Sequence, residues 1–162
     1  MEYIFGKYLP EVVKMGRIIS AICTTLLLAG FTASCQAVDN PDAPDYVTDF
    51  KQRAQPFEVV IHQQAKTTQD SLKAYADYEQ FLDKELNKTY KSVLTKLGAE
   101  QQAKIKESQR NWIKYRDSEF DLIAENWTAK NFGSSSVLSR GAYRTTIIRD
   151  RVTLLLNYLK NY

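Results

Sequence analysis

The amino-acid sequence predicts an all-α protein: a three-helix up-down antiparallel bundle that follows a signal peptide and a flexible tether. Beyond residue 66, apolar residues repeat at steps of three, four and seven, as they do on one face of a helix. Gly98 and Gly133 divide this part of the chain into three such segments, and none of them has the alternating pattern of a strand. Connections this short make successive helices run antiparallel.

The first predicted helix begins near Asp70 and ends before Gly98, a residue free to take the left-handed conformation at a helix end. The second begins at Ala99 and ends before Gly133, and the third begins at the capping serines that follow. The apolar stripe of the first helix comprises Leu72, Tyr75, Leu82, Leu86, Tyr90, Val93 and Leu97. The third helix carries Val137, Ile147, Ile148, Val152, Leu155, Leu156 and Leu159.

The N-terminal part has the layout of a bacterial export signal. Lys14 and Arg17 precede an uncharged apolar run from Ile18 to Phe31, and small residues lead on to Cys35. This run is shorter than the roughly 20 residues that a membrane-spanning helix needs, so we expect it to be removed. Met15 lies directly before the signal-like part, and the start codon therefore stays open between Met1 and Met15.

Two ways of processing this signal stay open. The residues before Cys35 resemble the acylation signal of bacterial lipoproteins, which predicts lipidation of Cys35. Thr32 stands where a leucine is usual, and this favours the ordinary signal peptidase, cutting for example after Ala37. An uncleaved anchor is a third possibility. In each case the protein faces the cell envelope, in the periplasm or as a lipoprotein anchored to the inner or outer membrane.

The expected organisation has three parts: an extension with signal peptide at residues 1–34, a tether at 35–66 and a helical domain at 67–162. The tether begins with a stretch rich in Pro and Asp and shows no sustained helical or strand period. A short helical turn is expected from Thr48 to Ala54, because Pro56 would interrupt anything longer.

Charge and composition exclude several classes of protein. The net charge is only +3, which argues against binding nucleic acid through counterion release. His62 is the only histidine, and with two cysteines in the chain neither a metal site nor a catalytic triad is expected. We therefore predict neither enzyme activity nor a cofactor. The last segment is locally basic, either as a solvated helix face or as a surface for a partner or anionic lipid.

Two polar residues interrupt the apolar stripe of the second helix. Gln109 and Arg116 share a face with Ile105, Trp112 and Phe120. A charge on a core-facing stripe is costly unless it is paired, so we expect Arg116 to meet a carboxylate, either Asp83 or Glu119. Asn87 and Tyr90 of the first helix are candidates to complete a hydrogen-bonded group with Gln109.

The same polar residues belong to two motifs. The segments D-K-E-L-N-K-T-Y and Q-R-N-W-I-K-Y-R-D resemble the D-x-x-L-N-x-x-Y and Q-R-x-W-x-x-x-R-D motifs of the LprI-like lysozyme inhibitor family. The matching residues are Asp83, Leu86, Asn87, Tyr90, Gln109, Arg110, Trp112, Arg116 and Asp117. The resemblance extends over about residues 68 to 159. Many members have cysteines where this chain has Phe120 and, nearby, Ala142, so the disulfide they imply is absent here.

The resemblance implies an exported helical protein that binds and inhibits a lysozyme-type muramidase. We expect the motif residues themselves to hold the bundle together and not to touch the enzyme. We expect the binding site on the connection between the second and third helices, where donors could reach the enzyme's cleft. Its residues are Lys130, Asn131, Phe132, Ser134 and Ser135. Two alternatives stay open: an immunity protein against an envelope-targeting toxin, and a structural or assembly lipoprotein without inhibitory activity.

Overall fold

The computed structural model describes residues 43–162, and the regular structure in this range is entirely helical. The predicted signal peptide, the first residues of the tether and Cys35 lie outside the described residues. Three long helices occur where the spacing predicted them, and two further α-helices and a π-helical turn accompany them. In order these are α1 Tyr46–Val59, the π-helical turn Val60–Gln64, α2 Thr68–Lys96, α3 Ala99–Asn126, α4 Ala129–Phe132 and α5 Ser135–Lys160.

Helix α1 occupies most of the segment that was expected to be a tether, so this expectation is wrong for residues 46–64. Asp45 caps its start by accepting a hydrogen bond from the Thr48 backbone N–H at 3.0 Å. Phe50 and Ala54 are buried in the core, with 1% and 2% of their surfaces exposed. Packing of such residues, one turn apart, determines the helix more strongly than composition does.

Pro56 lies inside α1 and does not end it, contrary to expectation. A proline in a helix costs about 3 kcal/mol because it removes one backbone hydrogen bond and crowds the preceding turn. Pro56 is exposed, whereas Phe57 in the next position stacks on Phe81 of α2 at 4.6 Å between ring centroids. The chain then widens into the π-helical turn, in which the Ala65 N–H donates to the Val60 carbonyl at 2.9 Å.

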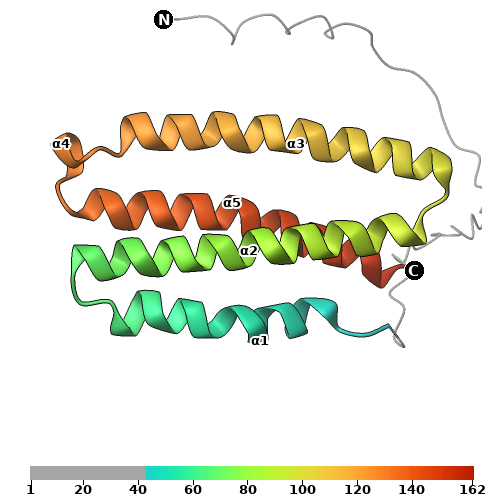
Figure 1. The fold of residues 1–162 in the computed structure, drawn as a ribbon, viewed down its shortest axis with the longest axis horizontal. Coiled ribbons are helices and arrows are strands. Elements are labelled where there is room, and N and C mark those ends of the chain that lie inside the picture. The colour runs from blue at the N-terminus through green and yellow to red at the C-terminus, as the bar shows by residue number, and fades with distance from the viewer. Residues whose placement is uncertain (1–42) are drawn as a thin grey trace, which may run out of the picture. The chain divides into compact units, whose positions relative to one another are not determined.

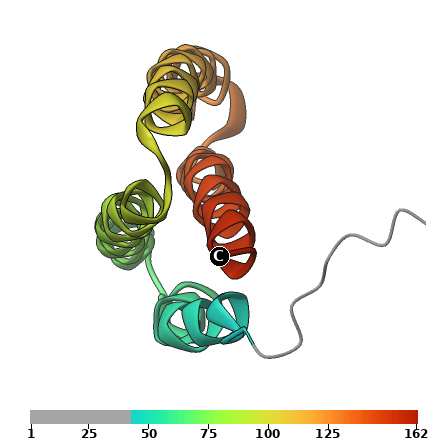
Figure 2. The ribbon, with the colours of Figure 1, turned by 90° about the vertical axis from the view of Figure 1, so that its right-hand side faces the viewer.

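Helices α2 and α5 form the centre of the fold and run parallel, while α1 and α3 run antiparallel to them (Figure 1). Figure 2 shows α1 and α3 on opposite sides of this pair. Successive long helices are antiparallel as predicted, but the arrangement is not the three-helix bundle expected. Helix α3 packs on α5, and α1 packs on both α2 and α5.

A small residue allows the central pair to approach closely. Gly141 of α5 lies against the ring of Tyr75 of α2, and a Cβ atom at this glycine would fall 2.2 Å from the ring. Further along α2 and α5 the core consists largely of aliphatic side chains, among them Leu82, Ile148 and Val152. Leu72, which the sequence placed on the stripe, is exposed instead.

The two glycines between the long segments have different roles. Gly98 separates α2 from α3 as expected, but its φ of −71° is not left-handed, and it is the N-cap residue of α3. Gly133 has a φ of 59°, which only glycine adopts at low cost, and it turns the chain from α4 into α5. This turn positions the candidate binding loop.

Candidate functional site

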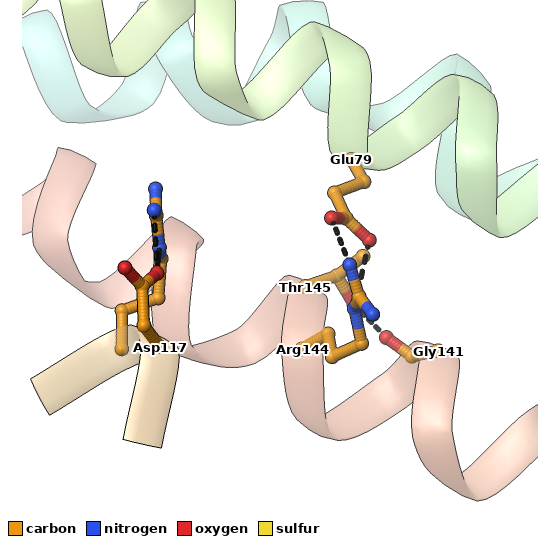
Figure 3. A network of polar contacts seen from close by, with 6 residues as sticks. Glu79, Asp117, Gly141, Arg144 and Thr145 are labelled. Carbon is orange, nitrogen blue, oxygen red and sulfur yellow. Dashed lines mark hydrogen bonds and ion pairs between the residues drawn. The ribbon is translucent and has the colours of Figure 1, made fainter. Parts of the chain in front are cut away.

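The family-motif residues gather where α3 meets α5 and faces α2, among aromatic rings and arginines. The most closely paired arginine is Arg144 of α5, which reaches Glu79 of α2 (Figure 3). Its Nη2 lies 2.6 Å from Glu79 Oε1 and its Nε lies 3.1 Å from Oε2, a bidentate geometry. The guanidinium also lies 4.2 Å from the ring centroid of Phe120, so one side chain connects α2, α3 and α5.

Arg116 pairs with a carboxylate, as expected, but with a different one. Its Nε and Nη2 donate to Asp117 Oδ1 at 2.9 and 2.7 Å, and neither Asp83 nor Glu119 takes this role. Arg116 also stacks on the rings of Trp112 and Phe120, at 5.5 and 5.7 Å from their centroids. The aromatic faces supply part of the stabilisation that a buried carboxylate was expected to supply.

Asp83 is a half-buried carboxyl beside these arginines. Burial raises the pKa of Asp83 above its ordinary value, and the nearby Arg116 offsets part of this effect. Asn87 does not join a group with Gln109, contrary to expectation, because its Nδ2 donates to the Asp83 carbonyl of its own helix and its side chain is exposed.

Gln109 is buried and has Arg151 of α5 as its partner. Arg151 Nε donates to Gln109 Oε1 at 3.0 Å, and its Nη2 donates to Ser108 Oγ at 3.2 Å. Only 7% of the Arg151 surface is exposed, and burial lowers the pKa of this guanidinium. The Arg151 guanidinium also lies 5.8 Å from the centroid of the Trp112 ring. Sequence reasoning identified Gln109 but not Arg151, which stands next to apolar Val152 and looked like part of a solvated basic face.

The motif residues therefore divide into two groups. Leu86 and Gln109 are buried, and Asp83, Tyr90, Trp112 and Arg116 are half-buried. Asn87, Arg110 and Asp117 are exposed. In the first group, Gln109 and Trp112 contact Arg151 of α5, whereas Arg116 contacts residues of its own helix.

The expected binding loop contains a short helix and is stiffened by local hydrogen bonds. Thr128 caps α4 by accepting from the Asn131 backbone N–H at 3.3 Å. Ser135 Oγ donates to the Phe132 carbonyl at 2.6 Å, and the buried Ser136 donates to the Gly133 carbonyl at 2.8 Å. All the candidate residues, Lys130, Asn131, Phe132, Ser134 and Ser135, are exposed.

A cavity of about 750 Å³ opens beside this loop, between the start of α5 and the start of α2. Ser134 and Ser135 line one side, and His62 and Thr67 line the other. His62 was expected on a linker but belongs to the π-helical turn. Within the described residues no group of three or more His, Cys, Asp or Glu side chains is placed to hold a metal ion.

Comparison with known families decides the affiliation. The sequence model of the family described as Lysozyme inhibitor LprI matches residues 61–155, more than half of the chain. The chain belongs to the LprI lysozyme inhibitor family. The resemblance predicted from the two motifs is thereby confirmed. A search of curated proteins and a search of solved structures each give no significant match.

The LprI match begins at Ile61 and so includes α2, α3, α4 and most of α5, while α1 lies before it. All the motif residues and the candidate loop fall inside the matched range. LprI proteins are a family of inhibitors, and their partner is accordingly a protein, a lysozyme. Over residues 43–162 none of the helices combines the length and the apolar character that crossing a lipid bilayer needs.

Proposed function

We propose that this LprI protein acts in the bacterial cell envelope, where it binds a lysozyme-type muramidase and blocks its cleft without catalysing a reaction itself. The observation that carries the proposal is the family match over residues 61–155. The match includes an exposed, internally hydrogen-bonded loop between α3 and α5, as a cleft-blocking inhibitor requires. The predicted export signal, with its apolar run Ile18–Phe31, supports the location, and lipidation of Cys35 would hold the protein at a membrane.

The chemistry of the target explains why this loop suits the task. Glycosidases of this type use two carboxyl groups that flank the scissile bond. An inhibitor that reaches them needs hydrogen-bond donors, and the exposed Lys130 and Asn131 of the loop carry an ammonium and an amide. Ser134 adds a hydroxyl at the rim of the neighbouring cavity. Because the loop is already ordered, binding costs less conformational entropy than ordering a mobile segment would.

Inhibition assays with the purified full chain test the proposal. We expect micromolar protein to slow cell-wall hydrolysis by at least one lysozyme type. Lys130→Ala and Ser134→Ala should weaken the inhibition. Lys114→Ala, at an exposed lysine on α3, is the matched control and should not.

Two results of these assays would contradict the proposal. Absence of inhibition against several lysozyme types would remove the proposed activity. Inhibition that survives both loop substitutions would instead show that another surface blocks the cleft.

A further inference from the structure

An apolar strip runs along the outer side of the contact between α3 and α5. Tyr115 and Leu122 of α3 have 51% and 54% of their surfaces exposed, and Tyr143, Leu154 and Tyr158 of α5 are exposed as well. Between the two helices lies a cavity of about 220 Å³, to whose lining Tyr115, Leu122 and Tyr143 contribute. We call this surface the α3–α5 seam.

The spacing of these residues makes the seam one continuous face. Tyr115 and Leu122 are seven residues apart on α3. On α5, Tyr143, Leu154 and Tyr158 fall on the same helical face as Ile147, which also lines the cavity. Single exposed apolar side chains need no explanation, but an aligned strip of them on a soluble surface marks a place where another molecule packs.

The seam continues into the candidate loop through neighbouring aromatic rings. Phe132 of α4 lies 6.5 Å from Trp127, and Trp127 lies 4.7 Å from Tyr143, measured between ring centroids. Phe132 is itself exposed. A partner whose cleft takes the loop would therefore meet these aromatic side chains next, and aromatic anchors contribute much of the binding energy at protein interfaces.

The charges around the seam indicate what kind of partner fits. Glu119 lines the cavity, Glu125 lies one turn from Leu122, and Asp150 lies one turn from Ile147. Within the described residues Glu119 and Glu125 form no ion pair, and Asp150 has only Arg149 at 3.8 Å.

Most of the neighbouring arginines are engaged elsewhere. Arg116 and Arg144 are paired with Asp117 and Glu79, and Arg151 is buried against Gln109. Arg140, one turn before Tyr143, is half-buried and is the basic residue of α5 that adjoins the cavity. The border therefore carries three carboxylates against this arginine and is acidic on balance, which is complementary to a basic protein.

We infer that the α3–α5 seam is the surface on which a basic muramidase docks, with the loop after α3 entering its cleft. This inference rests on the proposed function and adds the binding surface and the charge of the partner. An enzyme that works on an anionic cell wall binds it faster when its own surface is basic. The acidic rim of the seam attracts the same basic surface. The aromatic strip then supplies the buried apolar contact.

The test compares matched variants of the full chain in binding titrations with a basic lysozyme. We expect Leu122→Ser to weaken binding at least about tenfold, as loss of a central apolar anchor does. Ile113→Ser, at another exposed apolar residue of α3 that does not line the seam cavity, should stay within about twofold of the unaltered chain. Thermal melts of each variant verify that the fold is kept.

A second pair of variants tests the charge. Glu119→Gln should weaken binding severalfold and reduce its dependence on salt. Asp121→Asn removes the same charge at an exposed position of α3 outside the cavity lining and should have little effect.

Each contrary outcome has a distinct meaning. Binding and inhibition that persist in both Leu122→Ser and Glu119→Gln would overturn the seam while leaving the proposed function intact. A concentration-dependent dimer in sedimentation that Leu122→Ser dissolves would assign the seam to a second copy and overturn the inference. An unaltered chain that inhibits some lysozyme type but binds no basic lysozyme would overturn this occupant and leave the proposed function intact.

Discussion

Helices α2 and α5 meet through close backbone approach and aliphatic packing, whereas α3 lies on α5 through arginines stacked on aromatic rings. At the first contact Gly141 touches Tyr75, and the surrounding core residues are almost wholly buried. On α3, only Ile105, Gln109 and Ile123 are buried. Stability therefore resides chiefly in α1, α2 and α5. Helix α3 is held by fewer, more polar contacts, and one of its sides is left available to a partner.

The strongest test of this comparison is removal of an anchor from α1. Phe50→Ala should lower the free energy of unfolding by about 4 kcal/mol, because it deletes a fully buried ring and leaves a cavity. Leu122→Ala on α3 should cost less than about 1 kcal/mol, since half of that side chain is exposed. Chemical denaturation measures both. Equal losses of unfolding free energy in the two variants would contradict the division between a stable core and a more loosely held α3.

The next largest effect is expected at the helix crossing. Gly141→Val should cost about 3 kcal/mol, because the new side chain overlaps the Tyr75 ring and forces α2 and α5 apart. Combining it with Tyr75→Ala should restore part of this loss, which distinguishes a clash from a general effect on the helix. A valine tolerated without loss would show that the two helices are less closely packed than described.

The polar attachment of α3 should give an intermediate effect. Arg151→Met leaves the buried Gln109 carbonyl oxygen without its donor, which should cost about 2 kcal/mol. We expect hydrogen exchange to rise in α3 and to change little in α2. The double variant Arg151→Met with Gln109→Met should recover stability, because neither buried group is then left unpaired. If protection from hydrogen exchange were instead lost equally in all helices, Arg151 would belong to the core that α1, α2 and α5 share.

The smallest effect concerns pH. Because burial raises the folded-state pKa of Asp83, the stability linked to this group is complete below its unfolded pKa and is lost as the pH rises through the folded pKa. Asp83→Asn removes that loss, so its melting temperature should exceed that of the unaltered chain at about pH 7 and match it at about pH 3. Asp121→Asn, at an exposed carboxylate, is the control. A stability difference for Asp83→Asn that persists at low pH would contradict the assignment.

Sequence periodicity predicted the three long helices because their stripes are long and interrupted only at Gly98 and Gly133. Helix α1 was predicted only as a short turn from Thr48 to Ala54, because Pro56 outweighed the helical spacing of Phe50, Ala54 and Phe57. The parallel packing of α2 on α5 includes the contact of Gly141 with Tyr75, residues far apart in the chain. No local pattern indicates such a contact.

At the candidate site, sequence reasoning found that Arg116 requires a carboxylate but could not identify which one. The choice depends on side-chain geometry, and the adjacent Asp117 gives the short contacts. The roles of Arg144 and Arg151 were missed because their partners, Glu79 and Gln109, lie on other helices. The candidate loop was located from its serines and Gly133, whereas the apolar seam beside it becomes visible only once α3 and α5 are placed together.

The position of α1 has a consequence for shortened forms of the chain. This helix lies across the central pair from α3 (Figure 2), and its Phe50 and Ala54 belong to the same core as Leu82 and Val152. A chain that began at Ile61, where the family match begins, would therefore lose one wall of its core while retaining α3.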